Sequence, residues 1–287
     1  MKKFSVILLM PLLASLFLSC EKNDENTQAA MIYISHRNDG MRGEGENYQR
    51  LDLENVYLYG SLIGSPLPSM NFFQIGSLKF SDSQYYHYSE GSIYFSPDNT
   101  VWEDQLDEPK FNTLSVTVNS SIGEIEGSVT FPDTIKTMSI DAADNIPIGT
   151  PVKVTWSGSN ADYYVVQFYY QYMEDEYTIL GYSNDTIVTS ESVTFNGNLF
   201  NKDGELNYFS IYPMNGPLPS AGSKPNMKGV GYGYIYTQNE SIESDRTIHV
   251  GNGIDEDLYL LLLSVKSAYV KEKPKMPLRF AKMLGIE

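Results

Sequence analysis

The 287-residue sequence contains few of the side chains on which enzymes and metal sites depend. It has one cysteine, three histidines and two tryptophans. A single cysteine excludes an intrachain disulfide and a cysteine-based zinc site. The histidines His36, His87 and His249 are scattered along the chain, and none has a partner at metal-ligand spacing. P-loop, nucleophile-elbow and zinc-protease motifs are also missing from the sequence. We therefore expect no catalytic residues and no cofactor.

Basic residues are also scarce, with 20 against 36 acidic residues and a net charge of −16. A surface of this sign repels the phosphate backbone, so we expect no nucleic-acid partner. The same charge contributes to solubility whatever the function is.

Long hydrophobic runs are rare, and the one at the N-terminus leads directly to the single cysteine. Lys2 and Lys3 precede an apolar run over residues 6–18, and Ser19 and Cys20 follow it. This run is too short to span a bilayer comfortably, which favours a cleaved signal peptide over residues 1–19. The segment resembles a bacterial lipoprotein signal, although Phe17 stands where leucine is usual. The resemblance implies that Cys20 is acylated and that the membrane is a partner; an ordinary secreted protein is the alternative.

Residues 21–26, directly after Cys20, are all polar, and Asp24 and Glu25 are adjacent acids. They resemble the surface-export signals of Bacteroidota lipoproteins, which implies an outer-membrane lipoprotein exposed on the cell surface. A plain solvated tether, with the protein facing the periplasm, is the alternative. We assign residues 20–49 to this tether, with residues 31–35 as a strand candidate.

What the sequence has in abundance is tyrosine, glycine and proline, with 22, 22 and 14 residues. This composition favours short strands and many turns. Alternation of apolar and polar residues over 50–135 predicts a first β-sandwich domain. Its clearest element is a hairpin in which Leu114, Val116 and Val118 share one face and Gly127 predicts a β-bulge in the returning strand.

Residues 136–250 predict a second β-sandwich. The stretch VKVTWSGSNADYYVVQF at 152–168 resembles two consecutive strands of a fibronectin type III or related immunoglobulin-like domain. Trp156 and Tyr164 match its core tryptophan and the tyrosine that opens the next strand, and Tyr208 falls near its buried tyrosine. The resemblance implies that residues 227–237 form the last strand. The predicted fold class is therefore all-β, with two tandem immunoglobulin-like or fibronectin type III-like β-sandwiches. Residues 251–287 could form a strand or a helix.

Two tyrosine-rich strands are candidate ligand-binding surfaces. In residues 229–236, Gly229, Gly231 and Gly233 share one face of the predicted strand, opposite Val230, Tyr232, Tyr234 and Tyr236. The glycine spacing does not fit a dinucleotide site. A row of tyrosines could stack on sugar rings. The alternative is that the tyrosines pack in the core while the glycines admit a neighbouring segment. The same alternatives apply to Tyr163 and Tyr169 in the strand from residue 163.

Three further features are candidates for other chemistry. Asn201, Asp203 and Glu205 could form a loose calcium site. Thr134 and Thr186 lie in two Asp-Thr-Ile triplets, which resemble the O-glycosylation acceptor of exported Bacteroidota proteins. Acidic clusters at 103–108, 173–176 and 254–257 could supply paired carboxylates for a hydrolase.

The sequence leaves three functional hypotheses. The first is a lipid-anchored, non-catalytic module that binds glycan or another extracellular ligand, including other surface proteins. The second is a structural or adhesive component of a cell-surface assembly, and the third is a hydrolase using loop carboxylates. Exposed, coplanar tyrosines would favour the first hypothesis, and buried ones the second.

Overall fold

The computed structural model describes residues 28–36, 56–64, 67–76, 78–81, 86–89, 92–95, 113–175, 178–220 and 222–254. The regular secondary structure in these ranges is almost all strand, with no α-helix and one short 3-10 helix, η4 (Gly197–Leu199). The prediction of an all-β fold is confirmed.

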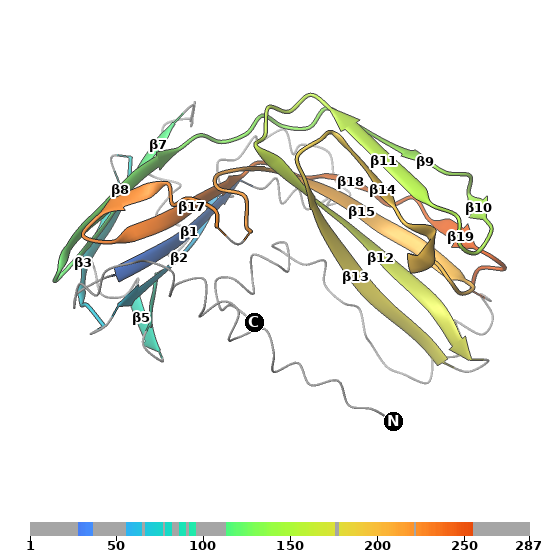
Figure 1. The fold of residues 1–287 in the computed structure, drawn as a ribbon, viewed down its shortest axis with the longest axis horizontal. Helices are drawn as coiled ribbons and strands as arrows, with labels where there is room; N and C mark the ends of the chain where they lie inside the picture. The colour runs from blue at the N-terminus through green and yellow to red at the C-terminus, as the bar shows by residue number, and fades with distance from the viewer. Residues whose placement is uncertain are drawn as a thin grey trace, which may run out of the picture.

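The first group of strands forms one strongly curled sheet, at the left of Figure 1. Its order is β4-β3-β7-β8-β16-β17-β1-β2-β6-β5. The bounds are β1 (Gln28–His36), β2 (Val56–Gly64), β3 (Met70–Ile75), β4 (Leu78–Phe80), β5 (Tyr86–Ser89), β6 (Ser92–Phe95), β7 (Leu114–Ser120), β8 (Gly123–Val129), β16 (Met227–Gly229) and β17 (Tyr232–Gln238). The two ends of this order meet, because the Tyr86 hydroxyl of β5 donates a hydrogen bond to the Phe80 carbonyl of β4.

The curled sheet encloses one hydrophobic core. In β7 the buried residues Leu114, Val116 and Val118 alternate with more exposed ones, as the period-2 pattern predicts. Ile32 and Ile34 of β1 are fully buried in the same core. Two halves of the sheet therefore face each other across a shared core, as in a sandwich.

The second group is a sandwich of two sheets, at the right of Figure 1. One sheet is built on β12 (Tyr163–Asp175), β13 (Thr178–Val188) and β15 (Gly204–Asn215), with β18 (Ile242–Ser244), β19 (Ile248–Val250) and β10 (Asn145–Ile146) at its edge. The other has the order β14-β11-β9, formed by β14 (Ser192–Phe195), β11 (Val152–Ser157) and β9 (Thr137–Asp141). Trp156 and Tyr164 meet edge to face in the core between them, with ring centroids 5.1 Å apart.

The two groups are joined by a short ladder and a third core. β15 pairs with β17 through Met214–Gln238 and Asn215–Thr237. Six side chains, mostly tyrosines from both groups, are buried around this ladder: Tyr33, Tyr163, Val165, Tyr212, Met214 and Tyr236. We refer to these six residues as the junction core.

The boundaries between the groups differ from the expected domain boundaries. Residues 28–36 were assigned to the tether, but they form β1, which lies between β17 and β2. Residues 227–237 were expected to complete the second sandwich, but β16 and β17 pair with β8 and β1 in the first group. The described chain thus passes between the groups after β8, after β15 and after β17.

The β-bulge expected at Gly127 does not occur. β7 and β8 pair in continuous register from Leu114–Val129 to Ser120–Gly123. Gly127 instead permits a close approach, because a Cβ atom there would lie 2.6 Å from the Asn226 carbonyl oxygen.

Several predicted segments lie outside the described residues. These are the signal peptide 1–19, Cys20 with the polar stretch 21–26, the acidic cluster 103–108, and the C-terminal segment from residue 255.

The central position of β1 can be tested with Ile32→Ala. Ile32 is fully buried, so the lost transfer energy and the cavity should lower the unfolding free energy by about 2–5 kcal/mol. Ile148→Ala is the matched control, because Ile148 is 48% exposed and should tolerate the same truncation within about 0.5 kcal/mol. Urea unfolding of both variants measures the difference, and equal midpoints would contradict the assignment of β1 to the core.

Candidate functional site

The row formed by Tyr232, Tyr234 and Tyr236 is not a flat exposed surface. Tyr236 is only 3% exposed and belongs to the junction core. Tyr234 stacks on it with ring centroids 6.4 Å apart, and its hydroxyl donates to the Ser223 carbonyl. Tyr232 lies edge-on to Tyr234, at an interplanar angle of 86°. The inner end of the row is therefore part of the connection between the two groups.

The glycines opposite this row admit strand β1. A Cβ atom on Gly231 would lie 2.0 Å from the Gln28 carbonyl oxygen, and one on Gly233 would lie 2.9 Å from that of Ala30. The glycine face thus serves close packing of backbones, the second of the two alternatives for this strand.

Tyr163 is also unavailable to a ligand. It is 1% exposed, and its hydroxyl has no hydrogen-bond partner. Burial raises the pKa of Tyr163 well above its ordinary value, and the nearby Tyr236, Tyr33 and Asp162 raise it further. The junction core therefore holds a neutral, unsatisfied hydroxyl group.

Tyr169 has a different environment and a partner that the sequence did not indicate. It is partly exposed, and its ring centroid lies 6.5 Å from that of Tyr208, which is 48% exposed. The Tyr169 ring extends over Gly181 of β13, where a Cβ atom would lie 2.3 Å from the Tyr169 hydroxyl. Tyr169 and Tyr208 form the aromatic pair that we take as the candidate binding site.

The expectation that Tyr208 is a buried core tyrosine was wrong. A β-bulge shifts the pairing of β12 and β15 between Gln167–Ser210 and Tyr169–Asn207. The extra residue transfers the core position to Phe209, which is fully buried. Tyr208 itself has φ +52°, the one positive φ among non-glycine residues of the described ranges. Left-handed backbone at such a residue is unfavourable by about 1–2 kcal/mol.

Polar side chains surround the aromatic pair. Gln167 and Tyr169 share the outer face of β12, because side chains alternate along a strand. Gln167 pairs with Ser210 of β15 in the ladder, and both side chains are largely buried. Asn207 lies opposite Tyr169, and its buried Oδ1 atom has no hydrogen-bond partner. Since Gln167 and Ser210 are buried, Asn207 is the one of these three polar residues that a ligand can reach, and its amide can hydrogen-bond to sugar hydroxyls.

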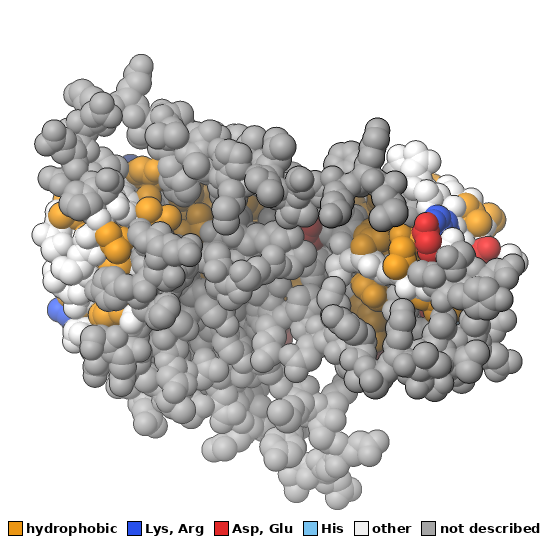
Figure 2. Space-filling view, turned by 90° about the horizontal axis from the view of Figure 1, so that it is seen from below, with side chains coloured by type: hydrophobic (Ala, Val, Ile, Leu, Met, Phe, Trp, Pro, Cys, Tyr) orange, Lys and Arg blue, Asp and Glu red, His pale blue; other side chains and the backbone are white. Residues whose placement is uncertain are grey.

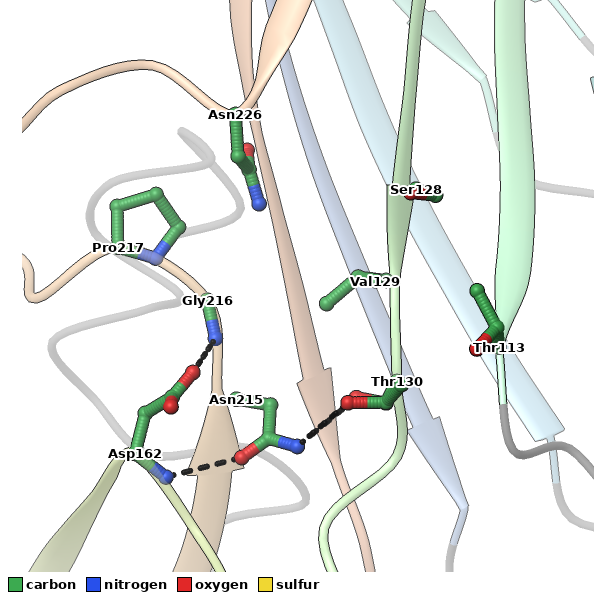
Figure 3. Close-up of a pocket in the computed structure, with 9 residues that line it drawn as sticks. All are labelled: Thr113, Ser128, Val129, Thr130, Asp162, Asn215, Gly216, Pro217 and Asn226. Atoms are coloured by element: carbon green, nitrogen blue, oxygen red, sulfur yellow. Dashed lines mark hydrogen bonds between the residues drawn. The ribbon is translucent and has the colours of Figure 1, made fainter.

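A polar hollow of about 340 Å³ lies beside the end of β15, between described elements of the two groups. Figure 3 shows how its polar groups are connected. Asn215 accepts a hydrogen bond from the Asp162 N–H and donates to Thr130, while Asp162 accepts one from the Gly216 N–H. These groups bind each other across the junction, so the hollow has a structural explanation.

The calcium candidates do not converge on one point. Asp203 Oδ1 accepts a hydrogen bond from the Asn252 N–H at 2.7 Å. Glu205 faces a different partner, His249 Nδ1, at 3.4 Å. Asn201 is exposed, and no group of three metal-ligating side chains occurs among the described residues.

The two glycosylation candidates have different surroundings. Thr134 is exposed in the connection between β8 and β9. Thr186 lies within β13, on the same face as Tyr182 and Val188, which pack against the second core. Of the two threonines, Thr134 is thus the one with room for a glycan.

The acidic clusters considered for a hydrolase lie mostly outside the described residues. In the cluster 173–176, Glu174 forms a salt bridge with Lys202. Of the cluster 254–257, only Ile254 is described. No helix in the described ranges is long and apolar enough to cross a membrane.

No protein-family model matches the chain, and no curated protein matches it significantly.

The unsatisfied hydroxyl of the junction core can be removed with Tyr163→Phe. A buried polar group without a partner destabilises a fold by about 1–3 kcal/mol, so the variant should unfold at a higher temperature than the parent. The parent should also lose stability above about pH 10, because the unfolded tyrosine ionises there while the folded one stays protonated. Thermal melts between pH 7 and 11 measure both effects.

Tyr170→Phe is the comparison for this test. Burial raises the pKa of Tyr170 to about 12, but its hydroxyl donates to the Lys202 carbonyl. Its removal should therefore not stabilise the protein at pH 7. Equal behaviour of the two variants at pH 7 would contradict an unsatisfied hydroxyl at Tyr163.

Proposed function

We propose that the protein is a lipid-anchored, cell-surface binding module that recognises glycan through the aromatic pair Tyr169–Tyr208. The proposal includes acylation of Cys20, exposure at the outer membrane as in Bacteroidota lipoproteins, and a non-catalytic role. It also includes an immunoglobulin-like or fibronectin type III-like relationship, which the Trp156–Tyr164 contact in a two-sheet core supports for the second group.

The observation that carries the proposal is the backbone of Tyr208. A glycine would adopt φ +52° without strain, yet a large aromatic residue occupies the position and is half-exposed. β-Bulges re-aim side chains and are frequent next to functional sites. An unfavourable conformation that places an aromatic ring on the surface indicates that the ring is used there.

The chemistry around the pair supports a carbohydrate ligand. Two partly exposed rings provide apolar area with a polar tip, as stacking on a sugar requires. The amide of the partly exposed Asn207 lies opposite Tyr169 in the ladder and can hydrogen-bond to sugar hydroxyls. The net charge of −16 favours a neutral or cationic ligand over an anionic one.

The second candidate is a structural or adhesive role, and the junction core favours it. Tyr163 and Tyr236, two of the five tyrosines first considered for binding, are buried there and connect the groups. A chain that passes repeatedly between its two groups is suited to bearing load. This role would require no ligand at Tyr208.

The glycan proposal is tested with Tyr208→Gly in the soluble Cys20→Ala protein. Glycine relieves the backbone strain, so folding stability should stay within about 1 kcal/mol of the parent. Loss of the ring should weaken glycan binding at least tenfold, equivalent to about 1.4 kcal/mol. A polysaccharide array followed by calorimetry on the best ligand measures the affinity.

Two further variants distinguish the effect of losing an aromatic ring from the effect of changing the backbone at residue 208. Tyr208→Trp retains an aromatic surface and should retain binding, while Tyr169→Ala should lose it. Leu180→Ala is the control, since Leu180 is 43% exposed on β13 and lies outside the pair. Absence of binding across a broad array, or unchanged affinity of Tyr208→Gly, would favour the structural role.

Anchoring has its own test in Cys20→Ala expressed with the full signal peptide. The substitution removes the acylated thiol, so incorporation of labelled fatty acid should fall to background and the protein should leave the membrane fraction. Cys20→Ser is a control that changes the same atom with less change in size. Continued labelling of either variant would disprove acylation at residue 20.

A further inference from the structure

The position of β1 relates the N-terminal anchor to the rest of the fold. β1 starts at Gln28, which pairs with Gly64 at the end of β2. It ends beside Gln238, the residue of β17 that pairs with Met214 of the second group. The chain thus enters the first group at the end furthest from the junction and runs toward the second group (Figure 1).

The distance from Cys20 to this entry point is limited by covalent geometry. Seven residues separate Cys20 from Gln28. A fully extended chain spans at most about 3.6 Å per residue, so Cys20 lies within about 29 Å of the start of β1. If Cys20 carries the lipid, this end of the first group is held close to the bilayer surface.

The described surface at this end is uncharged. Four connections meet there, because Met70 pairs with Ser120, Gly229 with Ile125, Gln28 with Gly64, and Ile63 with Ser92. The described residues of these connections are 63–64, 67–70, 89, 92, 120–123 and 229–232, and none of the sixteen is charged. At the 20% charged residues of the whole chain, about three would be expected. Of the described residues, the first charged ones beyond these, Glu124 and Lys228, lie one residue further along their strands.

Two of these residues are large, exposed hydrophobic side chains. Ile63 is 42% exposed and Val230 is 44% exposed. Val230 is held rigidly, since its N–H donates to the Glu124 carbonyl and its side chain lies over Gly123. Seen from below, the described side chains toward the outer end of the first group are mainly hydrophobic or uncharged polar, with a Lys or Arg side chain visible at the edge (Figure 2).

We infer that this end of the first group, centred on Ile63 and Val230, rests on the lipid surface. The inference depends on the proposed acylation of Cys20, because the short tether then keeps this end of the first group near the bilayer. Exposed aliphatic side chains without charges gain free energy in the interfacial region of a bilayer. β1 then points away from the membrane over its nine residues, about 30 Å, and carries the second group with Tyr208 outward.

The test uses the full acylated protein in vesicles. Acylation consumes the only native thiol, so Val230→Cys introduces one reactive position for an environment-sensitive fluorophore. Ile148→Cys is the matched control, because Ile148 is equally exposed, at 48%, and lies near Gly251 at the far end of the second group. Lipids with nitroxide groups at the bilayer surface quench only fluorophores that approach them.

We expect at least threefold stronger quenching at position 230 than at position 148. Ile63→Cys repeats the measurement at an independent position in case Val230→Cys folds poorly. Equal quenching at position 148 and at positions 63 and 230, with acyl labelling of Cys20 intact, would disprove the membrane contact but not the lipid anchor. Loss of acyl labelling would overturn both. Glycan binding at Tyr208 is measured separately and is unaffected by either result.

Discussion

The parallel pairing of β1 with β17 is the contact on which the rest of the structure depends. β1 lies between β17 and β2, so without it the curled sheet of the first group would be divided in two. The pairing also fixes β17, whose last residues form the ladder to β15 and whose Tyr236 contributes to the junction core. One short N-terminal strand therefore stabilises the first group and positions the second.

The tyrosines show how one residue type serves several purposes in a single β-structure. At the junction, Tyr33, Tyr163 and Tyr236 supply large buried surfaces. In the second core, Tyr164 and Tyr170 pack their rings inward and bond through their hydroxyls to backbone carbonyls. At the bulge, Tyr208 is turned outward by a left-handed backbone. The junction and core tyrosines are buried, whereas Tyr208 and its neighbour Tyr169 are at least partly exposed. The proposed binding function therefore lies on one face of the second group.

The proposed anchor, β1 and the aromatic pair follow one another along the length of the molecule. The proposed lipid is attached eight positions before Gln28, β1 leads from that end to the junction, and the aromatic pair lies beyond it on β12 and β15. Such an arrangement suits a protein that presents a binding face away from the membrane. A structural role would use the same geometry, with the interleaved chain resisting separation of the two groups.

The alternation of apolar and polar residues along the sequence is enough to predict many of the strands. Alternating side chains identified the hairpin from Leu114 to Val129 and the core face of β12, because one face of a strand must avoid water. The lone Cys20 and its flanking residues predict a lipid anchor at the outer membrane, which stays a prediction. The partners of the strands were decided only by the tertiary structure. Alternation shows that residues 232–238 form a strand but carries no information about which neighbour completes its ladder. Likewise, no periodic pattern could reveal the bulge at Tyr208, because a one-residue insertion in the ladder depends on the partner strand's register.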